Sequence, residues 1–438
     1  MYDMLIISPG KFSRVIDKLV LHKKRIGIYC RVKTPDEIYK EISDGRDYQE
    51  KIKYFIKREL DIHSIRYVLL FGGMEQVPAR YCHIPTNYNT EPAFDVALTE
   101  KKFVSDLYYA DIYDENSVFS SWDTNNDNIF AEWKGKEAED KNLDLRPDVA
   151  IGRIPCNSVW EAETVVNKII QYEQTLHLRE EWFNKIVTVA GDTYPDNEYC
   201  DGEMDAEEII KYMTGFKKEN LWTSNGLLHS TWGLEVLETI NKGCGFLVFF
   251  GHGNPPYWGT YPYKTNKLIS IITLLHIQML SNVGKFPVCF APGCKNSAFD
   301  LKFSNLINDP IGSFYKMDYF PKCWSWMWLR KKDGGSIATI GGTGLGFMRQ
   351  DAEADGEGGW SYMGELFFKN YKKGIVTIGD LWKKCIEDYL KKYEIDWNTP
   401  SPVYNKKQPK NSVVHAKTVE VFTLFGDPTL KIGGYNKN

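Results

Sequence analysis

The stretch FLVFFGHG, residues 246–253, decides the fold. Five consecutive apolar residues predict a buried strand, and this strand ends at a histidine that stands between two glycines. In an open parallel sheet, ligands bind in the crevice beyond the carboxyl ends of the strands. We therefore expect His252 to face such a crevice, where glycines on either side let a ligand approach the backbone closely.

A second strand ends in a complementary way. The segment FPVCFAPG, residues 286–293, is followed directly by Cys294. If the two strands are neighbours, an imidazole and a thiol meet at one edge of the sheet, as the nucleophile and base of a cysteine hydrolase do. The amides of Gly253 and Cys294 could then stabilise an oxyanion. The structural alternatives are a histidine in an ordinary loop and a cysteine that acts as a small buried hydrophobe, which is the interpretation we give Cys244 and Cys289.

The rest of the chain alternates strands and helices. Short apolar strands and amphipathic helices follow one another over residues 1–73, and the rhythm resumes after residue 185. This order predicts an α/β protein with a mostly parallel sheet. Residues 84–147 are irregular but rich in aromatic residues, which favours a long structured loop region. We place a boundary near residue 180, between an N-terminal α/β subdomain (1–180) and a catalytic subdomain (181–438).

Composition excludes several classes of protein. The 438 residues carry a formal net charge of -4 and no basic block, which argues against nucleic-acid binding. No apolar run approaches the roughly 20 residues that span a bilayer. The nine scattered cysteines favour a reducing compartment over a disulfide framework. Since no secretory signal is visible, we expect a cytoplasmic protein, unless the N-terminus has been trimmed.

The two strand ends resemble the gingipain family of cysteine peptidases, which belongs to the caspase-like clan. The cysteine follows Pro287 by seven positions, and Phe299 also fits the pattern. Further landmarks occur in the order of the family: RYVLLFGGMEQVPAR (66–80), PDVAIGRIP (147–155), KIIQYE (168–173) and LFGDPTL (424–430). The resemblance implies a caspase-like αβα sandwich, with Cys294 and His252 as the catalytic dyad.

The resemblance also implies roles for acidic residues. Asp192 occupies the position of an acid that orients the histidine; a simple turn aspartate is the alternative. Glu203 and the nearby Asp205 match an acid that selects Arg or Lys at P1, although they also suit the acidic first turn of a helix. Asp351, in the acidic segment RQDAEADGEGG (349–359), could serve the same end, and we expect Trp258 to contact substrate.

One motif resembles the start of a calcium loop. The segment DTNNDNIFAE spaces oxygen ligands at Asp123, Asn125 and Asp127, with Asn128 at the turn and Glu132 following. Asparagine can take the left-handed turn conformation that glycine usually supplies there. A polar surface turn is the alternative. We expect no organic cofactor and, at most, this structural calcium.

These observations predict a cysteine endopeptidase that acts on protein or peptide substrates through an acyl-enzyme. The alternative is a non-catalytic caspase-like scaffold or binding protein. A nucleotide-binding protein is disfavoured, because the glycine pairs at 334–335 and 341–342 lack the Lys and Ser/Thr of a phosphate loop. The polar loop 395–413 is a candidate for activating cleavage of a stored zymogen. The oligomeric state is left open.

Overall fold

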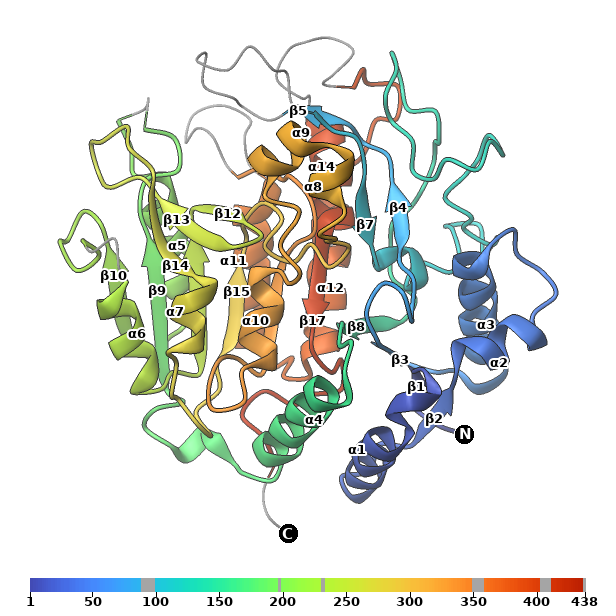
Figure 1. Ribbon diagram of the computed structural model, residues 1–438, viewed down its shortest axis with the longest axis horizontal. Coiled ribbons are helices and arrows are strands. Elements are labelled where there is room, and N and C mark those ends of the chain that lie inside the picture. The colour runs from blue at the N-terminus through green and yellow to red at the C-terminus, as the bar shows by residue number, and fades with distance from the viewer. Residues whose placement is uncertain (88–98, 196–197, 230–232, 349–357, 402–410, 436–438) are drawn as a thin grey trace.

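A single large sheet runs through the molecule (Figure 1). The computed structural model describes residues 1–87, 99–195, 198–229, 233–348, 358–401 and 411–435. Within these ranges, ten strands form one sheet in the order β10-β9-β11-β15-β16-β17-β8-β3-β1-β2. The strands are β1 Met4–Ile7, β2 Cys30–Lys33, β3 Tyr67–Phe71, β8 Ala150–Ile154, β9 Lys185–Ala190, β10 Lys217–Trp222, β11 Phe246–Phe250, β15 Val288–Ala291, β16 Ala338–Gly342 and β17 Phe422–Phe425.

The sheet consists of two parallel halves that run in opposite directions. All neighbouring strands are parallel except β16 and β17, which pair antiparallel. The carboxyl ends of β9, β11, β15 and β16 therefore lie at one end of the sheet. Those of β1, β3 and β8 lie at the other end, where α1 and α4 follow (Figure 1). This arrangement places the ends of β11 and β15 side by side, as the sequence predicted.

Helices cover both faces of the sheet. On the face of β11 that carries Phe246 and Phe250, the sheet packs against α5 (Asp201–Ile210) and α11 (Gly359–Lys372). On the opposite face, Leu247 and Phe249 pack against α6 (Leu234–Asn241), α7 (Leu274–Gln278) and α10 (Trp324–Arg330). Because successive side chains of a strand point to opposite faces, an uninterrupted apolar run such as β11 is buried on both sides.

The remaining helices and strands complete the molecule. The other helices are α1 Ser13–Arg25, α2 Pro35–Glu41, α3 Tyr48–His63, α4 Val159–Glu173, α8 Asn305–Asn308, α9 Pro310–Lys316, α12 Ile378–Lys392 and α14 Asn411–Val421. Small sheets are formed by β12 His252–Asn254, β13 Tyr257–Thr260 and β14 Ile269–Thr273, by β4 Arg80–Cys82 and β7 Phe103–Ser105, and by β5 Thr86–Asn87 and β6 Thr99–Glu100. No helix in the described ranges is long and apolar enough to cross a bilayer.

A buried ion cluster joins the two ends of the chain. Lys23 on α1 lies 2.7 Å from Glu173 on α4 and 2.8 Å from Asp427, which follows β17, and all three side chains are fully buried. The two carboxylates outweigh the desolvation of the ammonium group and raise the pKa of Lys23. Residues 1–180 and the C-terminal segment thus share both a sheet and a core, while the subdomain boundary near residue 180 stays a prediction.

The irregular region behaves as its aromatic content predicted. Between residues 99 and 147 the structure has short strands and turns, and Tyr108, Tyr109, Trp122 and Trp133 are buried. The strand β10 was not expected, because KKENLW is too polar to suggest a strand. It forms an edge of the sheet, where such a sequence is tolerated.

One buried carboxyl group has, among the described residues, no nitrogen or oxygen donor beside it, and its hydrogen-bond partner is the Cys82 thiol. Glu420 on α14 is 1% exposed, and burial raises its pKa to about 8. A carboxyl whose pKa rises on folding stabilises the fold while it is protonated. That contribution is complete below about pH 4.5 and is lost as the pH rises toward 8.

We predict that Glu420→Gln raises the thermal midpoint at about pH 8.5 by several degrees and changes it little at pH 5, because each pKa unit corresponds to about 1.4 kcal/mol. Differential scanning fluorimetry across this pH range measures the effect. The matched control is Glu238→Gln, on the exposed side of α6. A Glu420→Gln protein with the same thermal midpoint as the wild type at both pH values would contradict the prediction.

Candidate active site

A tight hairpin presents His252 and Gly253 at the end of β11. Strand β12 pairs antiparallel with β13 around the two-residue loop Pro255–Pro256. If Asn254 and Tyr257 were a non-hydrogen-bonded pair, the ladder would need the N–H of residue 255, which is a proline and has none. Asn254 and Tyr257 are therefore a hydrogen-bonded pair, and Gly253 belongs to the next, non-hydrogen-bonded pair. β12 is an edge strand, so the Gly253 N–H points to the open side of the hairpin.

The hairpin packs at Gly253 against the loop that carries Cys294. A Cβ atom at position 253 would lie 2.7 Å from the carbonyl carbon of Gly293 and 2.1 Å from Oδ1 of Asn296. A Cβ at position 293 would lie 3.0 Å from the Cα of Gly253. The two glycine backbones are thus in contact, and this contact brings the histidine loop and the cysteine loop together.

The imidazole of His252 is held by a main-chain carbonyl. Its Nε2 lies 2.9 Å from the carbonyl oxygen of Thr193, and its ring packs edge-on against Tyr261. A carbonyl can only accept, so Nε2 carries the proton and Nδ1 is the basic nitrogen. Burial lowers the pKa of His252 below 6.5, partly opposed by the hydrogen bond to Thr193.

Asp192 holds the loop that supplies this carbonyl. Its side chain accepts a hydrogen bond from the Tyr194 N–H at 3.1 Å, and its backbone pairs with Tyr261. Burial raises the pKa of the Asp192 carboxyl. The contact that orients His252 in the structure comes from Thr193, so an influence of Asp192 on the histidine would act through the turn at 192–194.

Cys294 follows β15 in a loop fastened to the end of β16. The N–H groups of Lys295 and Ser297 donate to the carbonyls of Gly344 and Gly342, at 3.0 and 2.8 Å. Lys295 has a φ of +57°, a left-handed conformation that non-glycine residues rarely adopt. The Cys294 thiol lies 3.9 Å from the Gly346 carbonyl, and burial raises the pKa of this thiol.

The electrostatics of the two groups describe a neutral pair. A thiol with a raised pKa and an imidazole with a lowered pKa both stay uncharged near pH 7. Among the described residues, the Cys294 N–H has no hydrogen-bond acceptor, and the Gly253 N–H lies on the unpaired edge of the hairpin.

The two predicted specificity acids are occupied by neighbouring groups. Glu203 is 6% exposed and accepts hydrogen bonds from Thr223 and Ser224, in the loop after β10. Asp205 accepts a hydrogen bond from Ser361 on α11. Glu203 still contributes negative charge near Asp192, whose pKa it helps to raise.

Two further predicted contacts have different outcomes. The prediction that Trp258 binds substrate is wrong: its side chain is fully buried and packs on Phe249 in the core beneath the hairpin. A tryptophan near a histidine in a hairpin can pack in the core under that hairpin instead of contacting substrate. Asp351 lies outside the described residues.

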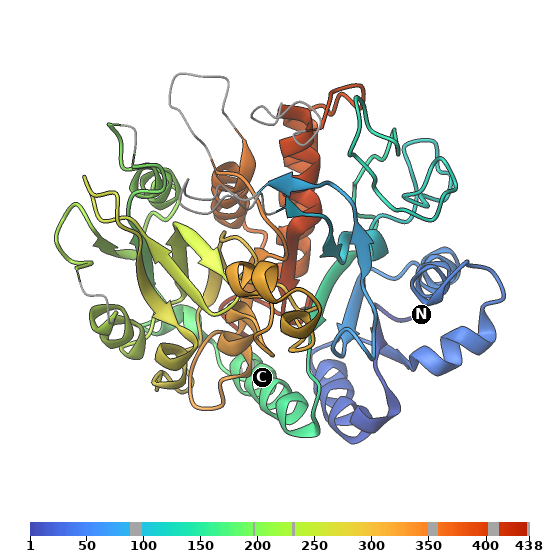
Figure 2. The same ribbon diagram turned by 45° about the horizontal axis from the view of Figure 1, so that its top comes forward.

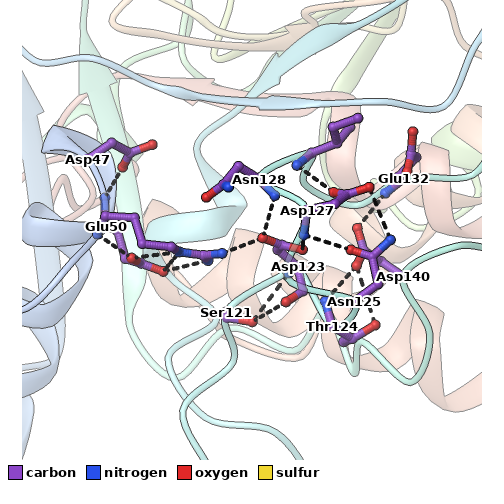
Figure 3. A network of polar contacts seen from close by, with 12 residues as sticks. Asp47, Glu50, Ser121, Asp123, Thr124, Asn125, Asp127, Asn128, Glu132 and Asp140 are labelled. Carbon is purple, nitrogen blue, oxygen red and sulfur yellow. Dashed lines mark hydrogen bonds and ion pairs between the residues drawn. The ribbon is translucent and has the colours of Figure 1, made fainter.

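The predicted calcium loop forms the expected turn, but the positive charge beside Asp123 is the side chain of Arg46. Asn128 adopts a φ of +67°, as anticipated, and the Asp123 carboxylate accepts the N–H groups of Asp127 and Asn128 at 3.1 and 3.0 Å (Figure 3). The same carboxylate forms an ion pair with the guanidinium of Arg46. Arg46 also pairs with Glu50, and together these carboxylates raise its pKa.

The other proposed ligands do not converge on a common point. Asn125 donates to Asp127 at 3.2 Å (Figure 3). Glu132 forms an ion pair with Lys134. In the described part of the chain, no group of three or more His, Cys, Asp or Glu side chains is placed to hold a metal ion. The arrangement does not fit Ca²⁺, because Arg46 already supplies the positive charge next to Asp123.

Comparison with known proteins decides the family. Residues 1–433 match the family model described as peptidase family C25. The chain belongs to this family of gingipain cysteine peptidases. Its fold is also that of the crystal structure of the Arg-specific cysteine proteinase gingipain R, with a TM-score of 0.64 and 19% identity over 98% of this chain and 78% of that one.

The relatives of this C25 chain are distant in sequence. Gingipain R2 of Porphyromonas gingivalis is 21% identical over 98% of the chain and 46% of its own length. An uncharacterised protein of Archaeoglobus fulgidus is 26% identical over 60% of the chain and 64% of its length. The chain spans about half the length of the gingipains it matches.

Two contributors to the C25 site were missed in the sequence. Thr193 acts through its carbonyl, for which a side-chain pattern gives no signal. Asn296 is fully buried against Gly253 and Gly293, and its Oδ1 has no hydrogen-bond partner. The signal that could have pointed to Asn296 in the sequence is its position two residues after Cys294. Asn296 fills the space between the two loops and so fixes their separation.

We predict that a chelator leaves the thermal midpoint of the wild type unchanged, whereas Arg46→Ala lowers it by several degrees. The substitution removes the countercharge of two buried carboxylates, those of Asp123 and Glu50. The control is Arg66→Ala, which breaks an exposed ion pair with Asp380 of small energetic value. A fall in the wild-type midpoint on adding EDTA, reversed by Ca²⁺, would contradict this account.

We also predict that alkylation of Cys294 by iodoacetamide accelerates with pH up to and beyond pH 9, with no plateau in the acid range. Burial keeps the thiol protonated until above its ordinary pKa, and only the thiolate reacts. Inactivation rates measured against pH, with the modified residue mapped by mass spectrometry, test this. A rate already constant below pH 7 would indicate a stored ion pair instead.

Proposed function

We propose that the chain is a cysteine endopeptidase whose nucleophile is Cys294. The observation that carries the proposal is the contact between the Gly253 and Gly293 backbones, which unites the histidine loop with the cysteine loop at the ends of adjacent strands. Membership of a cysteine peptidase family supports the same chemistry.

The reaction begins from the neutral pair. Nδ1 of His252 takes the thiol proton as sulfur attacks the scissile carbonyl carbon. The N–H groups of Gly253 and Cys294 donate to the oxyanion, and a preorganised pair of this kind contributes several kcal/mol, on the order of 3 per donor. The imidazolium then protonates the leaving amine, and water hydrolyses the thioester to release the acid and restore the thiol.

A preference for Arg or Lys at P1 is the second part of the proposal. Glu203 and Asp192 place carboxyl groups on the histidine side of the site. The solved relative gingipain R is described as Arg specific. A basic side chain that approached these carboxylates would gain charge-assisted hydrogen bonds.

We predict that the wild type cleaves fluorogenic peptides with Arg or Lys at P1, and that Cys294→Ala lowers kcat/KM by at least about 1000-fold, since it removes the nucleophile. A cysteine-directed acyloxymethyl ketone should label wild type at Cys294. The control is Cys30→Ala, which removes a half-buried thiol at the opposite edge of the sheet.

Different results would overturn separate parts of the proposal. Best cleavage after Asp would remove the P1 preference but keep the peptidase. Equal activity of wild type and Cys294→Ala would exclude the nucleophile. A folded wild type that neither cleaves peptides nor reacts with the ketone would favour a scaffold or binding protein with an idle dyad.

A further inference from the structure

A cavity lies next to the cysteine loop and has no part in the chemistry described above. It encloses about 460 Å³, and its lining includes Tyr81, Lys102, Lys295, Asp300, Asp309 and Thr343. Lys295 directly follows Cys294, so the cavity begins one residue from the proposed nucleophile. It is formed between β6–β7 and the α8–α9 insertion, which Figure 2 shows in orange beside the blue strands.

The cavity lies across Cys294 from the histidine. His252 follows β11, Cys294 follows β15, and Thr343 follows β16, and these three strands are consecutive in the sheet. His252 protonates the leaving amine, so the carboxyl-side product departs from its side. The substrate residues that precede P1 therefore extend toward the cavity.

Two of the four carboxylates that line the cavity are already paired. Glu100 forms an ion pair with the fully buried Lys417 at 2.9 Å and accepts the N–H of Leu345. Asp309 caps α9 through the N–H of Gly312 and lies 3.4 Å from Lys316. These groups have little charge left to offer a ligand.

Asp300 and Asp318 are the two other lining carboxyls. Asp300 accepts a hydrogen bond from the Tyr81 hydroxyl, and burial raises its pKa. Asp318 keeps one buried oxygen without a hydrogen-bond partner. They offset part of the positive charge of the lysines around them.

The lysines of the cavity are less well paired. Among the described residues, Lys101, Lys102 and Lys295 have no carboxylate within ion-pair distance, and Lys302 is 3.6 Å from the exposed Glu75. The ammonium of Lys102 lies 4.0 Å from the centre of the Tyr81 ring, which holds it over the cavity wall. The free charge at the rim is therefore positive.

We infer that this cavity is a subsite for an acidic side chain of the substrate, an Asp or Glu on the amino-terminal side of the scissile bond. The inference rests on the proposed peptidase function and extends it from the P1 residue to a second position. The recognised substrate sequence then contains an acidic residue before a basic P1 residue. The two side chains bind on opposite sides of the site.

The experiment compares isosteric peptides with Glu or Gln at each position from P2 to P5 and from P1′ to P3′, with P1 constant. Wild type should prefer Glu over Gln about fivefold in kcat/KM at one amino-terminal position, and the preference should shrink as NaCl rises. Lys102→Glu should lose it and favour Lys at that position, while the Gln peptides are cleaved as before.

Lys102 is chosen because it is exposed and separate from the strained residue Lys295. The matched control is Lys332→Glu, an exposed lysine at the opposite end of the sheet, before β16 begins, which should keep the wild-type preference. Equal cleavage of Glu and Gln peptides at every amino-terminal position would overturn the inference. So would a preference that survives Lys102→Glu.

A binding measurement separates failure of the subsite from failure of the proposed function. Fluorescence anisotropy with labelled Glu and Gln peptides on the Cys294→Ala protein needs no turnover. Tighter binding of the Glu peptide, abolished by adding Lys102→Glu, supports the subsite even if no peptide is cleaved. Equal binding of the two peptides overturns it whatever the activity of the wild type.

Discussion

The contact between the backbones of Gly253 and Gly293 is the constraint on which the site depends. Each strand end could carry its functional residue alone, but a catalytic pair needs two loops closer than side chains normally allow. A Cβ at either glycine would meet the opposing backbone or Asn296 at 3.0 Å or less. The side chain of Asn296 lies against both glycines and also limits how closely the two loops approach. The sequence G-H-G therefore serves packing as much as access for a substrate.

Burial then decides how the two groups divide their proton. Both are desolvated, and desolvation opposes charge on each, which lowers the pKa of His252 and raises that of Cys294. The Thr193 carbonyl fixes the tautomer without supplying the negative charge that a carboxylate would add. A neutral acceptor stabilises the imidazolium less, so the resting state keeps the proton on sulfur. In the proposed mechanism, the thiol gives up its proton only as it attacks a bound substrate carbonyl.

The two strands and the meeting of their ends could be predicted because their signals are strong and local. Apolar runs that stop at Gly-His-Gly and Pro-Gly-Cys define both β11 and β15 and the edge where they meet. Contacts made by main-chain atoms, and roles that depend on where an element lies in the fold, could not be predicted. Thr193 acts through a carbonyl, β10 is polar because it lies at an edge, and Trp258 is aromatic because it supports the hairpin. The Asp123 loop shows the same limit: its turn follows from its own residues, but its cation comes from Arg46, 77 positions away.

The antiparallel pairing of β16 with β17 explains how the N-terminal part of the chain reaches the site. Strands β1, β3 and β8 end away from the dyad, so their own carboxyl ends cannot contribute to it. The segment between β3 and β8 must instead travel back along the sheet, and it returns as β4 to β7. There Glu100 pairs with Lys417 and binds the N–H of Leu345, in the loop that also fastens Cys294 through Gly344 and Gly346. A change at Glu100 would thus be felt at the cysteine loop. The N-terminal half is part of the wall of the site and not an appendage to it.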